Sequence, residues 1–449
     1  MSSVSSHLRA RRCSVVFAVA LPLILVLSVL SARDGRAEEI SSAIDLEHCV
    51  QTALSNSSSL RALGENQRAA TAGVDEARAQ RWPTLSVGAD FNYQSEVNEF
   101  DLPAPISRTI RFGDNESYGL FADLELPLYT GGRLAAQERA QREAANASGF
   151  DLAADSLRVI QQVRAGFYQA LGAQAEVDAA NLAVQRLRRH LEELEQQVRA
   201  GAASSEARLQ VEARLRAAEQ RLLNAEEQRS VRRLQLGRAL GFPAREVVPA
   251  GQLDRTLLSS NEIPSGASSV DLRPELHALS SRQSANQEAS RAAKGSLLPS
   301  LNATAQLHYA RPGVRVIENE WMDWATVGLR LQWTLFDKGG RSARAEQYAA
   351  TARALSHRHE ELQRELTSAL EISRAQVRAQ YQQVDKARQR ATLESQRLEL
   401  VRGRYQQGLG TETEFLDAQD DLSDAEIAVA AQRSRLRLAE VNLLYAVAR

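Results

Sequence analysis

The sequence predicts a mixed fold in which transmembrane β-strands continue into very long α-helices, and in which this arrangement occurs twice along the chain. Residues 133–200 contain no proline and carry apolar residues at helical spacing. The segments 84–129 and 300–336 instead alternate apolar and polar residues with the period of two that strands show. Short motifs of the first half recur in the same order in the second half. This recurrence indicates a tandem duplication.

Residues 1–37 have the features of a secretory signal peptide. Arginines between positions 9 and 12 precede an apolar run at 14–30, and Gly35-Arg36-Ala37 offers small residues for cleavage. A retained membrane anchor is the alternative, because the stretch before the cleavage site is long. The segment contains five Arg and one Asp, so its removal makes a chain with a formal net charge of −1 more acidic. This balance argues against a nucleic-acid-binding protein.

The mature chain retains one of the two cysteines, Cys49. An intramolecular disulfide is therefore not possible, and we expect Cys49 to be a small apolar residue packed within a helix. No apolar stretch of the mature chain approaches the length of a transmembrane helix. Any membrane crossing must therefore use strands.

The first repeat covers residues 38–243 and begins with a helix that Pro83 ends. The polar sequence Asn56-Ser57-Ser58-Ser59 marks a weak point within this helix. A β-hairpin follows at 84–129, and its strands of about ten residues suit the hydrocarbon core of a bilayer when they are tilted. A soluble hairpin with one buried face is the alternative. The apolar residues that alternate along its strands are Leu85, Val87, Ala89, Phe91, Tyr93, Tyr118, Leu120, Ala122, Leu124 and Leu126.

The long helix at 133–200 has a length of about 100 Å and must therefore lie against other helices. Its apolar residues follow the heptad spacing of a coiled coil. The seam consists of Val177, Val184, Leu187, Leu191, Leu194 and Val198. The solvated reverse face consists of Arg186, Arg188, Arg189, Glu192, Glu193 and Glu195. A turn at Gly201 to Ser205 leads to a return helix at 204–241. Residues 244–270 contain two prolines and form a linker, or equatorial segment.

The second repeat, residues 271–449, has the same elements in the same order. A helix precedes a β-hairpin at 300–336, a long helix at 341–406 and a return helix at 411–448. The matching motifs are Leu60-Arg61-Ala62-Leu63 with Leu276-His277-Ala278-Leu279, Pro83-Thr84-Leu85 with Pro299-Ser300-Leu301, and Gly131-Gly132-Arg133 with Gly339-Gly340-Arg341. Four strands per chain cannot close a barrel, and strands in lipid must leave no open edge. We therefore expect several copies to contribute strands to one barrel.

Three motifs carry a family resemblance. They are Pro-Leu-Tyr-Thr-Gly-Gly-Arg at 127–133, Asp-Lys-Gly-Gly-Arg at 337–341, and Arg-Tyr-Gln-Gln-Gly-Leu-Gly-Thr at 404–411, the last followed by Leu416-Asp417-Ala418. Together with the duplicated layout, these motifs make the chain resemble the TolC-like outer membrane efflux protein family. The resemblance extends over essentially the whole mature sequence.

The resemblance implies an outer membrane channel of a tripartite efflux or type I secretion system, that is, a passive export duct. Its fold would be a homotrimer with a twelve-stranded transmembrane β-barrel, four strands per chain, continued by a long α-helical coiled-coil barrel in the periplasm. Its partners would be outer membrane lipid, a periplasmic adaptor (membrane fusion) protein and an inner-membrane transporter. A coiled-coil structural tether of the cell envelope is the alternative, although a tether does not need the polar strand faces of a lumen.

The resemblance also implies a pore constriction at Glu414 and Asp417. These acids are three residues apart and share one face of a helix. Carboxylates from three subunits would then ring the periplasmic entrance and attract cations. A solvated acidic face is the alternative, because Glu412, Asp420 and Asp421 are equally acidic.

The two helix turns are further candidates for function. Tyr405 matches a position that helps to close the entrance in similar proteins. Gly410 stands where such proteins carry a bridging arginine, so we expect a weaker lock and a channel that leaks at rest. Helix reversal and capping also account for the turn residues. The adaptor-contact candidates are Gly201, Ser204, Gly408, Leu409, Gly410 and Thr411.

Nothing in the sequence favours an enzyme. His357 and His359 are two residues apart and therefore do not face together on a helix. The chain shows no phosphate-binding loop, nucleophile elbow or paired-cysteine site. We therefore expect no catalytic site, no cofactor and no resident metal.

Overall fold

The structure is a computed structural model and describes residues 43–448 apart from 103–104, 107–108, 113, 255–256, 258–269 and 316–318. The signal peptide expected at 1–37 and part of the linker expected at 244–270 lie outside the described residues. In chain order, the helices and strands are α1 (Leu46–Asn56), α2 (Ser58–Ala79), β1 (Thr84–Tyr93), β2 (Asn98–Asp101), β3 (Thr109–Phe112), β4 (Glu116–Tyr129), α3 (Arg133–Arg199), α4 (Ser205–Ala239), α5 (Pro274–Gly295), β5 (Ser300–Arg311), β6 (Met322–Gln332), α6 (Gly340–Gln406) and α7 (Glu412–Ala446).

Corresponding helices of the two halves have equal lengths. Helices α2 and α5 each contain 22 residues, α3 and α6 each contain 67, and α4 and α7 each contain 35. The helix that the sequence predicts before Pro83 is divided into α1 and α2 at its polar weak point. The hydroxyl of Ser57 accepts a hydrogen bond from the Leu60 amide and so caps α2.

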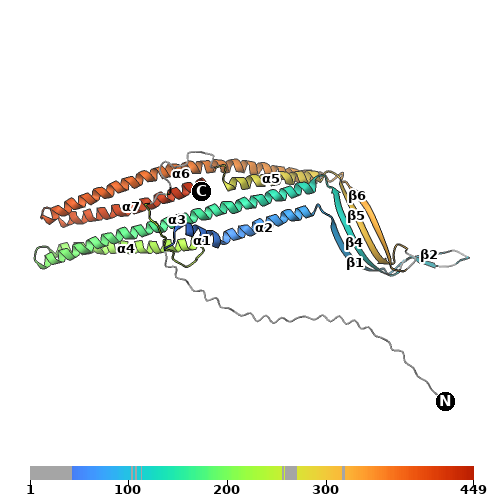
Figure 1. The fold of residues 1–449 in the computed structure, drawn as a ribbon, viewed down its shortest axis with the longest axis horizontal. Coiled ribbons are helices and arrows are strands. Elements are labelled where there is room, and N and C mark those ends of the chain that lie inside the picture. The colour runs from blue at the N-terminus through green and yellow to red at the C-terminus, as the bar shows by residue number, and fades with distance from the viewer. Residues whose placement is uncertain are drawn as a thin grey trace, which may run out of the picture. The chain divides into compact units, whose positions relative to one another are not determined.

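Strands β1, β4, β5 and β6 form one antiparallel sheet in that order (Figure 1). The pairing of β4 with β5 therefore joins the hairpin of the first half to the hairpin of the second. Strands β2 and β3 form a separate two-stranded ribbon within 84–129, where the sequence predicts a single hairpin. Each is four residues long, which is too short for an alternating pattern to be recognised. Arg111 Nε on β3 donates to Glu99 on β2 at 2.5 Å.

The two faces of the sheet differ in polarity. One face carries apolar side chains that are largely exposed, such as Val87 (78%) and Val327 (81%). The opposite face carries mostly polar residues, among them Asp123, Gln306 and Thr326, which lie side by side on three neighbouring strands. On the apolar face, ring contacts of 5.0, 6.4 and 4.9 Å join Phe91 to Tyr118, Tyr118 to Trp321, and Trp321 to Tyr309.

Glycines make the joints between the sheet and the long helices. Gly132 and Gly339 have φ angles of 79° and 84°, in the left-handed region that favours glycine, and they immediately precede the first turns of α3 and α6. In the second joint, Asp337 accepts hydrogen bonds from the backbone amides of Gly339 (3.1 Å) and Arg341 (3.0 Å). These backbone requirements explain why the Gly-Gly-Arg motif occurs in both halves.

Helix α3 lies at the centre of the helical part. It packs against α2, α4, α5 and α7, whereas α6 packs against α5 and α7 (Figure 1). Towards the α3–α4 turn, the buried apolar cluster consists of Val184, Leu187, Leu194, Val211, Leu215, Ala218 and Leu416. Cys49 lies fully buried in another cluster, around α1 and α3, and burial raises the pKa of its thiol to about 11. Among the described residues, no helix combines the length and the apolar character that crossing a membrane requires.

A buried carboxylate ties α3 to the end of the segment that leads into β1. Glu138 on α3 accepts hydrogen bonds from Arg81 (2.7 Å) and Arg142 (2.9 Å), and Arg78 Nε lies 3.5 Å away. The hydrogen bond from Arg81, followed by the charges of Arg81 and Arg142, holds the pKa of Glu138 below its usual range. The carboxylate therefore stabilises the folded state in its ionised form.

We expect Glu138→Gln to lower the melting temperature of the purified protein at pH 7, followed by the helical circular dichroism signal. The pKa of Glu138 is lower in the folded than in the unfolded chain, so its contribution is present above the unfolded pKa and is lost as pH falls through the folded pKa. The difference from wild type should therefore shrink as the pH falls below the pKa of a glutamate in the unfolded chain. The exposed Glu192→Gln serves as a control. A difference that does not change with pH would contradict this account.

Candidate functional site

The turns that close the two helical hairpins are built alike. Gly201 and Gly408 have φ angles of 72° and 74°, which glycine adopts at low cost. The amide that follows each glycine returns to a carbonyl five residues earlier, Ala202 to Gln197 at 2.8 Å and Leu409 to Arg404 at 2.9 Å. Both turns thus have the hydrogen bonds that end a helix in a left-handed residue. Adaptor contact at these residues stays a prediction.

The helices that leave the two turns are capped differently. Ser204 accepts a hydrogen bond from the Ala207 amide at 3.1 Å. At the second turn, Thr411 and Glu414 form a reciprocal capping box: the Glu414 amide donates to the Thr411 hydroxyl at 3.2 Å, and the Thr411 amide donates to the Glu414 carboxylate at 3.3 Å. One predicted constriction residue, Glu414, is therefore held against the start of its own helix.

The other predicted constriction residue, Asp417, lies in an ion pair between α7 and α4. Arg214 Nη2 donates to Asp417 Oδ1 at 3.1 Å, and Nη1 of the same guanidinium donates to Asp420. Burial raises the pKa of Asp420, although the charges of Arg214 and Arg221 oppose this effect. Glu414 and Asp417 thus have separate partners in this structure.

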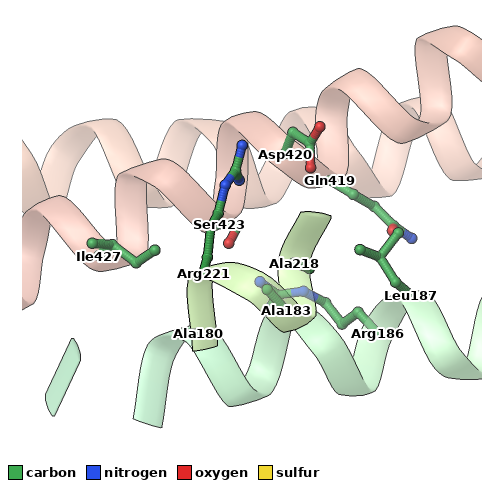
Figure 2. Close-up of a pocket in the computed structure, with 10 residues that line it drawn as sticks. All are labelled: Ala180, Ala183, Arg186, Leu187, Ala218, Arg221, Gln419, Asp420, Ser423 and Ile427. Atoms are coloured by element: carbon green, nitrogen blue, oxygen red, sulfur yellow. The ribbon is translucent and has the colours of Figure 1, made fainter. Parts of the chain in front are cut away.

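Next to these ion pairs, a small cavity lies where α3, α4 and α7 meet (Figure 2). Its volume of about 10 Å³ is close to that needed for one water molecule and far below that of a solute site. The ten residues around it are Ala180, Ala183, Arg186 and Leu187 of α3, Ala218 and Arg221 of α4, and Gln419, Asp420, Ser423 and Ile427 of α7. The three alanines allow the helices to approach closely.

The position of Arg186 corrects a prediction. The heptad pattern places Arg186 on the solvated face of its helix, but its side chain is only 19% exposed. The guanidinium donates two hydrogen bonds to the Glu426 carboxylate of α7, at 3.2 and 2.7 Å. The prediction was wrong because α7 packs against α3 on this side, which the sequence of α3 alone does not show.

His190, near the same end of α3, is buried, and no local sequence pattern indicates a role for it. Its side chain is 6% exposed, and Nε2 lies 2.6 Å from Glu412 Oε1. Because an ionised carboxylate can only accept, Nε2 carries the proton of this hydrogen bond. The imidazole also packs edge-on against Phe415, with 4.7 Å between ring centroids.

Tyr405 completes the same network. Its hydroxyl donates to Glu412 Oε2 at 2.6 Å, and its ring stacks on Phe415 with 5.3 Å between centroids. Burial raises the pKa of Tyr405, and the hydrogen bond to Glu412 raises it further, so the phenol stays protonated and donates. Each oxygen of Glu412 thus has its own donor, one from α3 and one from α6. We call His190, Tyr405, Glu412 and Phe415 the tip cluster.

The chain matches the model of a family described as outer membrane efflux protein over residues 49–242 and 268–449. The chain belongs to this family. Its members are channels rather than enzymes, and the chain is an outer membrane efflux channel. The alternative of a structural envelope tether is not favoured.

Solved structures share the fold at low sequence identity. The outer-membrane channel OprN matches with a TM-score of 0.75 at 20% identity, over 90% of this chain and 89% of that chain. The outer membrane protein VceC of Vibrio cholerae gives 0.74 at 18%, over 90% and 96%. The open state of the Neisseria gonorrhoeae channel MtrE gives 0.75 at 20%, over 90% and 88%. No curated protein matches the chain in sequence.

We expect His190→Phe to loosen the start of α7. Phenylalanine keeps the ring packing but leaves Glu412 Oε1 without its donor, and an unsatisfied buried acceptor costs about 1–3 kcal/mol. Amides at 412–420 should therefore exchange about tenfold faster or more in hydrogen–deuterium exchange mass spectrometry. His190→Gln, which restores a donor, should recover part of the protection, and the exposed His357→Phe should have no effect there. Unchanged exchange in His190→Phe would contradict a structural role for the hydrogen bond.

Proposed function

We propose that three copies of this chain, after removal of residues 1–37, form one export channel through the outer membrane. The observation that carries the proposal is the four-stranded sheet. One of its faces is apolar and exposed, as lipid contact requires. Within the described residues, β1 and β6 each pair on one side only, and open edges are not tolerated in lipid. Pairing β6 of one copy with β1 of the next closes twelve strands around a polar lumen.

The long helices support the same assembly. We propose that α3, α4, α6 and α7 of three copies form a helical barrel in the periplasm. Leucines on α4 and α6 are exposed in the single chain, and neighbouring copies would cover them. These leucines are Leu209, Leu223, Leu393 and Leu400. Burial of apolar area of this kind stabilises assembled subunits.

We propose that the helix turns form the periplasmic entrance, where the adaptor of an inner-membrane transporter docks. Leu409 is exposed at the apex of the second turn, as a docking residue must be. Glu414 and Asp417 would form the constriction, and Tyr405 would help to keep it closed. In the single chain, Glu414, Asp417 and Tyr405 contact Thr411, Arg214 and Glu412, respectively.

We expect the double variant Glu414→Gln, Asp417→Asn to conduct differently from wild type in planar bilayers. The wild-type protein should show cation-selective steps and a measurable resting leak, because Gly410 provides no bridging side chain. Removal of two carboxylates per subunit should enlarge the steps and reduce the cation preference severalfold. Unchanged steps would place the constriction elsewhere, and absence of current from both proteins would argue for the tether.

We expect Arg214→Gln to have the opposite effect on selectivity. Arg214 pairs with Asp417 and Asp420, so its loss removes the positive charge beside Asp417 and should increase the preference for cations. The comparison is the reversal potential in a salt gradient. Arg216→Gln removes the same charge from α4, but among the described residues Arg216 pairs with Glu212 and Glu219 of its own helix. Equal shifts in the two variants would show that net charge alone, and not the pair with Asp417, sets selectivity.

A further inference from the structure

One row across the polar face of the sheet is aromatic. The strand register places Gly88 of β1 opposite Phe121 of β4, Phe121 opposite His308 of β5, and His308 opposite Trp324 of β6. These four residues therefore lie at one level across all four strands. They share the face of Asp123, Gln306 and the other polar residues, because residues two apart in a strand point to the same side. We call Phe121, His308 and Trp324 the aromatic row.

The rings of the aromatic row cover the width of the sheet. His308 and Trp324 are stacked, with 4.9 Å between centroids and 13° between planes. Phe121 lies flat over β1: a methyl group added to Gly88 would sit 2.3 Å from Phe121 Cζ. Glycine at position 88 therefore leaves the space that the Phe121 ring occupies. The stacked rings of His308 and Trp324 thus lie on β5 and β6, and the Phe121 ring of β4 reaches over β1.

A carboxylate lies on each side of the aromatic row. Asp90 is on the adjacent row towards the β2–β3 ribbon, and its Oδ1 lies over Gly119. Asp123 is on the adjacent row towards the helices, between Ser86 and Gln306. Its Oδ1 is buried and has no hydrogen-bond partner among the described residues. A buried carboxylate oxygen in this position favours a bound donor or cation.

We propose that the aromatic row with Asp90 and Asp123 is a transient binding site for planar aromatic cations inside the channel. The inference rests on the proposed function, since the row faces a lumen only when the sheet closes into a barrel. A flat solute stacks on Trp324 and His308, its positive charge is attracted by the ring faces, and the carboxylates at the two neighbouring levels compensate it. In a trimer, the aromatic row occurs three times at one level of the lumen. Several weak binding sites allow a solute to bind and still leave the channel.

The site predicts that a planar aromatic cation blocks the current more strongly than a non-aromatic one. Ethidium added to wild-type protein in a planar bilayer should reduce the monovalent current in a concentration-dependent way. In Trp324→Ala, the concentration for half-block should rise about tenfold, whereas block by tetraethylammonium should not change. Thr326→Ala, on the same face and strand at the next level, is the matched control. Trp324→Phe keeps a ring and should retain most of the block.

Asp123→Asn tests the site without removing an aromatic residue. It should weaken block by ethidium severalfold. If the aromatic row served only to fill space, this substitution would not change the block. A wild-type protein that carries no current overturns the proposed function, and the site with it. If the wild-type protein conducts, but ethidium blocks wild type, Trp324→Ala and Asp123→Asn equally weakly, the binding site is overturned and the proposed channel is not.

Discussion

Burial of α3 between the two halves of the chain is the constraint on which the rest of the structure depends. Most of the stability of a helix in a protein comes from packing against other elements. Helix α3 packs against α2, α4, α5 and α7. Two of these helices belong to the first half and two to the second. The pairing of β4 with β5 adds a second link between the halves at the sheet. The duplicated halves therefore form one body rather than two domains in series.

The two long helices are equal in length but not in environment. Among the described residues, the main packing partners of α6, the counterpart of α3, are α5 and α7, and α6 exposes apolar residues. Ile372, Leu393 and Leu400 are examples. Two helices that correspond in the sequence repeat thus differ in position: α3 lies inside the helical part of the chain, and α6 lies at its edge. This inequality leaves an apolar margin for neighbouring copies, in the same way that β1 and β6 leave strand edges.

Towards the turns, apolar packing gives way to charged contacts between helices. The exposed pair of Arg214 with Asp417 joins α4 to α7 and is worth little in free energy, because solvent screens it. The tip cluster is different, because His190 and Glu412 are both nearly excluded from solvent. A buried charge with a hydrogen bond on each oxygen fixes orientation sharply. The α3–α7 contact at the tip is therefore specific, whereas the α4–α7 contact is easily exchanged for another.

Local patterns made much of this architecture predictable, and long-range contacts explain the rest. Proline-free heptads and period-two alternation depend on neighbouring residues only, so the long helices, the main strands and the glycine joints could be expected. The environments of Arg186 and His190 depend on partners 240 and 222 residues away, which no local pattern reveals. The capping box of Thr411 and Glu414 did carry a local signal, the Thr-x-x-Glu spacing, and was overlooked in favour of a pore role. That pore role stays a prediction.

Carboxylates occur both in the sheet and near the helix turns, but their charges are compensated differently. Asp417 has an arginine partner on another helix, so compensation of its charge depends on the contact between α4 and α7. Asp123 lies in a sheet whose backbone register fixes its position, and its buried oxygen has no partner within the described part of the chain. A displacement of α4 would therefore alter compensation of the first charge, whereas the second is open to a bound donor or cation. Under the proposed function, this difference assigns gating to the turns and contact with the transported solute to the sheet.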